Sequence, residues 1–109
     1  MDIKAVNLHT IIKDTTEPWS PVDVAHVNDH VARVALLTGH YHWHKHEAED
    51  ELFYILKGSI LIHLRDQPDI TVKKGQLAVI PKGVEHRTQA KKPAYVLLFE
   101  PASTQIKGD

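Results

Sequence analysis

The chain contains no cysteine, which excludes disulfide bonds, thiolate chemistry and sulfur ligands for a metal ion. Any metal must therefore be held by nitrogen and oxygen atoms. An excess of positive charge is also lacking, because the chain has 13 lysines and arginines against 14 acidic residues. No more than two basic residues are adjacent in the sequence, as at Lys91-Lys92. Nucleic acid binding normally requires a clustered basic face, so we expect no nucleic acid partner.

Long hydrophobic runs are missing as well. Every apolar run is interrupted by a charge or a glycine well before the roughly 20 residues that span a bilayer, and the start at Met1 to Lys4 lacks the apolar core of a signal peptide. We expect no membrane partner and a cytoplasmic protein. The 109 residues, of which 42% are hydrophobic and 25% charged, are typical of one globular domain.

Helical periodicity is nearly absent, and from Val31 onward short apolar runs each end at a turn former. The expected strands are Val31–Thr38, Leu52–Leu56, Ser59–Leu64, Ile70–Lys73, Leu77–Ile80 and Ala94–Phe99. Many short strands favour a sandwich or a barrel, so we predict an all-β core over residues 31–101. An irregular arm over 1–30, with an edge strand near Ala5–Ile12, precedes this core, and a polar, extended tail over 102–109 follows it.

Histidine is abundant instead: there are nine, and five of them fall between His30 and His46. Side chains alternate across a strand, so His44 and His46 should share one face. A turn-like acidic stretch, 47–50, would bring Glu51 beside them, and His86 follows the rigid turn Pro81-Lys82-Gly83. Three imidazoles and one carboxylate suit zinc, iron, manganese, nickel or copper, and suit calcium poorly.

These segments resemble the two motifs of the cupin superfamily. The first motif corresponds to Gly39, His44, His46, Glu51 and Gly58, and the second to Gly75, Pro81, Gly83 and His86. The spacer between Gly39 and His44 is one residue shorter than the common pattern, and Ala90 stands where many cupins carry asparagine. The sequence between and beyond these motifs, including Glu100-Pro101, is also similar to that of a group of small single-domain cupins.

The resemblance implies a cupin-type jelly-roll barrel, also called a double-stranded β-helix. It implies a divalent transition metal ion held by His44, His46, Glu51 and His86. The group of small cupins often carries no established activity, and some members have an inferred link to mannose-6-phosphate isomerase. The alternative for these four residues is an exposed histidine-rich hairpin that binds metal adventitiously.

The other histidines receive weaker interpretations. His40 and His42 have the same parity as the expected ligands, and we interpret them first as solvated or outer residues, with His42 the favoured catalytic candidate for proton transfer. His63 lies in an apolar strand and is interpreted as a hydrogen-bonded core residue. His9, His26 and His30 are assigned no function.

Strand parity also predicts which apolar side chains face inward. Phe53 and Ile55 share the parity of Glu51 and should line an apolar pocket wall near the metal. Trp43, Tyr41, Leu52, Tyr54 and Leu56 have the opposite parity and should form an outward patch that needs a cover. We therefore predict a homodimer, unless the N-terminal arm covers the patch.

Two functions remain open at this stage. The first is a metal-dependent enzyme, of oxygenase or isomerase type, that acts on a small molecule through open coordination positions. The second is a non-catalytic metal-containing module that binds a small ligand. Fold alone does not decide between them, and the sequence favours the enzyme.

Overall fold

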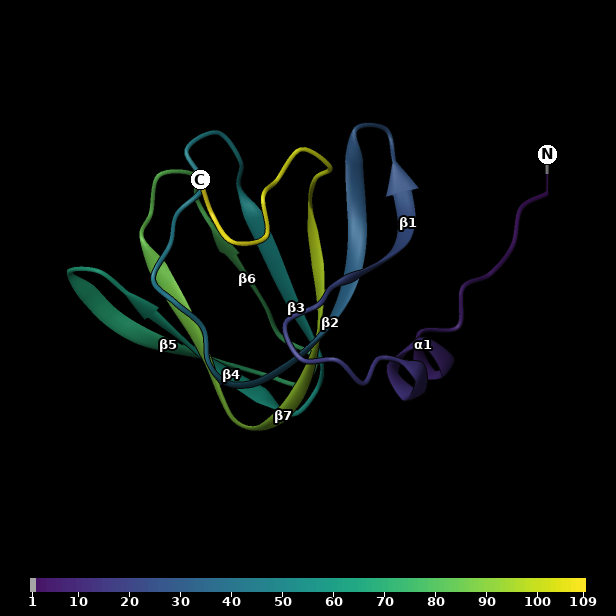
Figure 1. Cartoon of the computed structure of the whole chain (residues 1–109), viewed down its shortest axis with the longest axis horizontal. Helices are drawn as coiled ribbons and strands as arrows, with labels where there is room; N and C mark the ends of the chain where they lie inside the picture. The colour runs from purple at the N-terminus through teal and green to yellow at the C-terminus, as the bar shows by residue number, and fades with distance from the viewer. Residues whose placement is uncertain (1) are drawn as a thin grey trace.

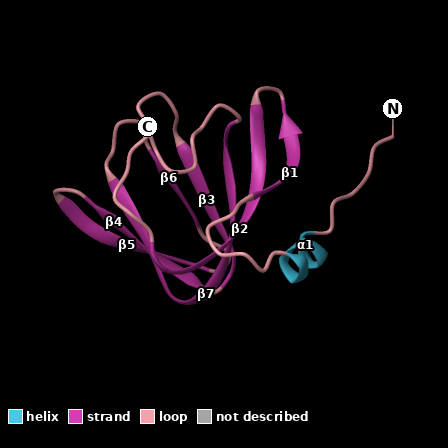
Figure 2. Ribbon diagram, viewed as in Figure 1, coloured by secondary structure: helices cyan, strands magenta, loops and turns pink. Residues whose placement is uncertain are grey.

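The computed structural model describes residues 2–109, which form one short helix and seven strands. The elements are α1 (Leu8–Asp14), β1 (Val22–Val27), β2 (His30–His40), β3 (Glu51–Lys57), β4 (Ser59–Leu64), β5 (Gln67–Lys73), β6 (Leu77–Ile80) and β7 (His86–Pro101). Figure 2 shows that the strands dominate and that the helix lies at one side of them. The all-β jelly-roll prediction is confirmed.

Strand β7 organises the sheet because its 16 residues pair with three partners. Its later part lies between β2 and β3, which gives the order β1-β2-β7-β3-β6. Its first residues, His86 to Gln89, pair with β4, which in turn pairs with β5. The long strand therefore passes from one side of the barrel to the other (Figure 1).

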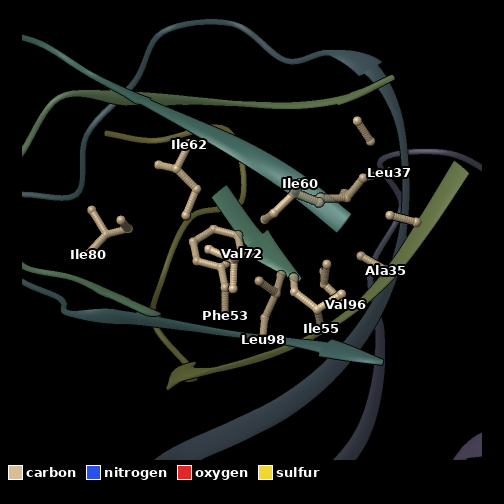
Figure 3. Close-up of a cluster of buried hydrophobic side chains, with 12 residues drawn as sticks. Ala35, Leu37, Phe53, Ile55, Ile60, Ile62, Val72, Ile80, Val96 and Leu98 are labelled. Carbon is tan, nitrogen blue, oxygen red and sulfur yellow. The ribbon is translucent and has the colours of Figure 1, made fainter. Parts of the chain in front are cut away.

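The core fills the space between these strands. Inward side chains of β3 and β7 alternate with outward ones, as the pleat requires, and Phe53, Ile55, Val96 and Leu98 are buried. They meet Ile60, Ile62 and Val72 from β4 and β5 in one cluster, whose side chains point toward one another in Figure 3. The inward placement predicted for Phe53 and Ile55 is confirmed.

The outer face of the same sheet is apolar too. Leu52 pairs with Phe99 and Val79, and Tyr54 pairs with Leu97 and Leu77, so these side chains stand in rows facing away from the core. Leu77 and Val79 on the edge strand β6 are 58% and 50% exposed. An apolar row that ends at an exposed edge strand is a surface suited to a second protein chain.

The prediction for the N-terminal arm was wrong in part. Residues near Ala5–Ile12 do not form a strand; Leu8–Asp14 form a helix, which begins at Asn7 because the Asn7 side chain accepts hydrogen bonds from the backbone N–H groups of His9 and Thr10. The edge strand lies later, at Val22–Val27, where it pairs with β2.

The prediction of an extended tail was also wrong. Residues 102–109 turn back toward the loop that follows β2, and the chain ends beside that loop (Figure 1). The backbone N–H of Asp109 donates to the carbonyl of Lys45 at 3.0 Å. Within residues 2–109, no helix is long and apolar enough to span a membrane.

Candidate metal centre

Four side chains from separate segments meet at one end of the barrel. Glu51 begins β3 and His86 begins β7, whereas His44 and His46 lie in the loop between β2 and β3. His44 is fixed by an antiparallel bridge to His86, in which each backbone N–H donates to the other residue's carbonyl, at 3.0 and 2.9 Å. Backbone hydrogen bonds thus join the two histidine-bearing segments directly.

The four side chains offer one ligand atom each, and these atoms all lie within 4.8 Å of one another. Glu51 Oε1 is 3.4 Å from His86 Nε2 and 3.7 Å from His46 Nε2. The His44 and His86 ring centroids are 4.4 Å apart. Three imidazoles and a carboxylate at this spacing are a donor set that a divalent transition metal ion fits.

The hydrogen-bonding state of the rings supports the same interpretation. His44 and His86 each donate Nδ1–H to a backbone carbonyl, of His42 at 3.0 Å and of Val84 at 2.9 Å. Their Nε2 atoms are therefore left with a free lone pair toward the centre. Among residues 2–109, His46 Nε2, His86 Nε2 and Glu51 Oε1 are buried and have no hydrogen-bond partner. Buried polar atoms usually have a partner, and a metal ion would supply it.

Burial controls the charge of this cluster. It lowers the pKa of His44 from 6.5 to about 4, and the nearby His86 imidazole acts in the same direction. Burial alone would raise the pKa of the Glu51 carboxyl, but the neighbouring His86, Glu100 and His46 side chains lower that pKa overall. At neutral pH the site therefore presents a neutral His44 and an ionised Glu51, which are the forms that bind metal.

A second carboxyl lies behind Glu51. Glu100, near the end of β7, is 1% exposed, and its Oε1 accepts a 3.0 Å hydrogen bond from Arg33 Nη1. Burial, followed by the charge of Glu51, raises the pKa of Glu100 to about 8, although Arg33 acts in the opposite direction. The sequence carries one signal for this residue, since Glu100 shares the inward parity of Val96 and Leu98, but parity alone predicts burial and no function.

A narrow pocket adjoins the centre, with a cavity volume of about 40 Å³, enough for a few water molecules. His44, Glu51 and Glu100 form its polar side. Its apolar side chains are Trp19, Pro21, Ala35, Leu37, Phe53, Leu98 and Ile106, and Tyr41 and Thr88 complete the lining. Trp19 from the arm and Ile106 from the tail were not predicted, because neither lies in a recognisable motif.

The tail helps to close this pocket. Ile106 lines it, and the neighbouring Lys107 carbonyl accepts a 2.8 Å hydrogen bond from His42 Nε2. Gly108 has φ of +88°, and a Cβ there would meet His44 Cβ at 2.6 Å. Only glycine allows the chain to pass this close to a predicted metal ligand.

Two geometric predictions about the loop were wrong. His44 and His46 do not share the face of a strand, because residues 41–50 form a loop in which only His44 makes a bridge. For the same reason, Tyr41 does not face outward with Leu52, Tyr54 and Leu56; it lines the pocket and stacks on Trp19 at 4.7 Å. Trp43 is half-buried, and the Arg65 guanidinium lies 4.0 Å from its ring centroid.

The remaining histidines lie outside the cluster. His42, the predicted proton-transfer residue, is exposed and hydrogen-bonded to the tail rather than placed in the pocket lining. His40 is exposed, with its ring centroid 6.5 Å from that of His63. His63 is hydrogen-bonded at both ring nitrogens, to Asp69 and Gln89, each at 2.9 Å, as predicted, but it is half-buried and lies outside the core.

Comparison with known proteins agrees with this geometry. A family model described as a cupin domain matches residues 32–100. The uncharacterised protein YdbB of Bacillus subtilis (strain 168) is 39% identical over 87 residues, which cover 80% of this chain and 77% of YdbB. A crystal structure of a cupin-2 domain protein from Shewanella frigidimarina NCIMB 400 is 35% identical, has a TM-score of 0.85, and is matched over 88% of this chain and 93% of that one.

An enzyme is also among the similar structures. A crystal structure of the DMSP lyases RdDddP and RnDddQII is 25% identical, with a TM-score of 0.61. The match covers 71% of this chain and 40% of that one. The same barrel is thus part of a larger lyase chain.

Proposed function

This chain belongs to the cupin family, and we propose that it is a metal-dependent enzyme acting on a small organic molecule. His44, His46, Glu51 and His86 would hold one divalent transition metal ion. The observation that carries the proposal is the set of four ligand atoms within 4.8 Å of one another, most of them buried. Buried nitrogens left without a protein partner among the described residues are otherwise unfavourable.

The ion would supply Lewis-acid or redox chemistry through coordination positions that the four side chains leave free. The side chains around the ion would bind the substrate and hold a proton. The Trp19 and Tyr41 rings and Phe53 offer an apolar wall against which a flat or branched carbon skeleton can pack. Glu100, behind Glu51, offers a carboxyl that can hold a proton near the reacting group.

The charge of the pocket favours one substrate class over another. Its acidic lining residues in the described part of the chain are Glu51, which is ionised, and Glu100, which holds a proton at neutral pH, and neither lysine nor arginine lines it. A phosphate group would find no lysine or arginine to bind its oxygens and would depend on the ion alone. Of the oxygenase and isomerase types, this disfavours a sugar-phosphate isomerase and favours a neutral or cationic substrate that reaches the ion through oxygen atoms.

The second candidate is a non-catalytic metal-containing module that binds a small ligand. The small cavity favours it, because about 40 Å³ leaves room for little more than a few water molecules beside the ion. Similar structures include a lyase, which favours the enzyme. Conversion of the ligand decides between the two candidates.

The first experiment is elemental analysis of protein purified without a histidine tag, together with His46→Ala and the control His26→Ala, which removes an exposed histidine of β1. We expect one ion per chain in the wild type and the control, and a loss of at least tenfold in His46→Ala. A full metal complement in His46→Ala would refute the site.

The second experiment incubates metal-loaded protein with a panel of neutral chelating molecules, such as hydroxyketones, diketones and catechols. Mass spectrometry follows conversion, and quenching of tryptophan fluorescence follows binding near Trp19. Conversion that disappears in His46→Ala supports the enzyme. Quenching without conversion supports the binding module.

A further inference from the structure

His46 differs from the other two imidazoles of the centre. It is 2% exposed, and neither of its ring nitrogens has a hydrogen-bond partner among residues 2–109. Its Nε2 faces Glu51 Oε1 at 3.7 Å, so Nε2 is the nitrogen directed at the metal centre. Its Nδ1 points elsewhere and has no backbone carbonyl to accept a proton, unlike the Nδ1 atoms of His44 and His86.

Two carboxylates outside the four-residue cluster lie close to this ring. Glu49 and Asp109 each place an oxygen within 4.8 Å of a ring nitrogen of His46 and of each other. Glu49 Oε1 is itself buried and lacks a partner within the described chain. Asp109 is held in place at two points, because its Oδ2 accepts a 2.6 Å hydrogen bond from the Glu47 N–H and its own N–H donates to the Lys45 carbonyl.

We propose that Glu49 and Asp109 are positioning residues for the metal ligand His46, and that they accept a hydrogen bond from its Nδ1–H when Nε2 binds the ion. This inference rests on the metal site of the proposed function. A ring that coordinates through Nε2 keeps its proton on Nδ1, and that proton needs an acceptor in a buried site. Backbone carbonyls serve His44 and His86, and the two acids take the same place for His46.

The contact requires a small movement. No hydrogen bond joins His46 to either acid in the described structure, so a side chain must rotate to bring an oxygen within reach. An ion bound at Nε2 makes the Nδ1 proton more acidic and strengthens such a bond.

A second ion among His46, Glu49 and Asp109 is the rival explanation, since three ligand atoms at this spacing can hold one. It would require His46 to bind metal through both ring nitrogens, which means losing both ring protons. An acceptor role for the two acids needs no such loss. The number of ions per chain separates the two explanations.

The test measures zinc affinity by competition with a chelator in Glu49→Ala, Asp109→Ala and the double variant. The matched control is Glu47→Ala, which removes an exposed acid of the same loop whose carboxylate pairs with Lys45 Nζ at 3.0 Å. We expect the double variant to bind zinc about 10–100-fold more weakly, each single variant to lose less, and the control to stay within about twofold of wild type. Glu49→Gln and Asp109→Asn should recover part of the lost zinc affinity, because an amide carbonyl still accepts a hydrogen bond.

A spectroscopic readout excludes a merely structural effect. In zinc-loaded protein, long-range proton–nitrogen NMR of the imidazoles should show a protected Nδ1 proton on His46 in the wild type. It should exchange rapidly in the double variant, while the Nδ1 protons of His44 and His86 remain protected. Thermal unfolding of the metal-free variants identifies any variant that does not fold, and the Gln and Asn forms then replace it.

Three results would overturn the inference. Equal zinc affinity in the wild type and the double variant would overturn it alone, leaving the metal site intact. Two zinc ions per wild-type chain and one in the double variant would replace it with a second metal site. A wild type that binds no zinc would remove the proposed function together with this inference.

Discussion

Metal-free protein should lose stability as the pH rises from 6.5 to 8, and Glu100→Gln should abolish that loss. The pKa of Glu100 is raised from 4.5 to about 8 by burial and by the charge of Glu51. Between these values the folded protein holds one proton more than the unfolded chain, so stability falls as the pH rises. Glutamine has the shape of the protonated acid and does not titrate.

His44 contributes to the free energy of unfolding with the opposite pH dependence, and this decides the pH range in which the effect of Glu100 can be measured. Its pKa is lowered to about 4, so its contribution is present above 6.5 and is lost as the pH falls toward 4, by about 1–2 kcal/mol after allowance for solvent screening of a half-buried ring. Below pH 6.5 the two groups partly cancel. Above pH 6.5 the contribution of His44 changes by only a few tenths of a kcal/mol, and because Glu100 is half ionised at pH 8 the expected net loss is about 1–1.5 kcal/mol.

The assay is urea unfolding of protein kept metal-free with a chelator, at pH 6.5, 7, 7.5 and 8, for wild type and Glu100→Gln. The free energy of unfolding should decline across the series in the wild type and stay level in the variant. Asp69→Asn, which removes an exposed carboxylate beside His63, serves as a control and should decline like the wild type. The same decline in Glu100→Gln would refute the assignment of the proton to Glu100.

Two further predictions concern the metal and the partner. Zinc should leave as the pH falls toward 4, because His44 becomes protonated in that range; elemental analysis after dialysis measures this, and full retention at pH 4 would contradict it. The apolar outer face should pair with a second copy of the chain, so light scattering should give twice the chain mass, and Leu77→Lys with Val79→Lys on β6 should give a monomer. A monomeric wild type would argue against this surface as an interface.

The strands could be predicted wherever an apolar run ends at a strong turn signal. Ser59–Leu64 and Leu77–Ile80 match the observed bounds of β4 and β6, because Gly58 and Pro81 mark their ends. β7 is longer than the predicted Ala94–Phe99, since its first residues, from His86, are polar and reveal no alternation of hydrophobic side chains. α1 was missed because a helix of seven residues gives little periodicity, and its Asn7 cap was not recognised.

More of the candidate site than of the segments around it could be predicted from the sequence. The spacing of the two motifs was enough to select the four residues that the structure brings together. The path of the loop between β2 and β3 was not predictable from parity, so Tyr41 was placed on the wrong side. The tail was missed because its contacts with Lys45, Glu47 and His42 are made mostly by backbone atoms, which leave no trace in the residue types.

The antiparallel bridge between His44 and His86 has a consequence for which ion the proposed site would hold. Since main-chain hydrogen bonds set the separation of these two donors, the chain orders them when it folds, before any ion arrives. A preassembled set of nitrogen and oxygen ligands discriminates weakly between neighbouring first-row metal ions, whose affinities for such ligands follow the Irving–Williams order. Occupancy would then track cellular supply, and protein produced in zinc-rich, iron-rich or manganese-rich medium should carry different ions in the same four-residue setting.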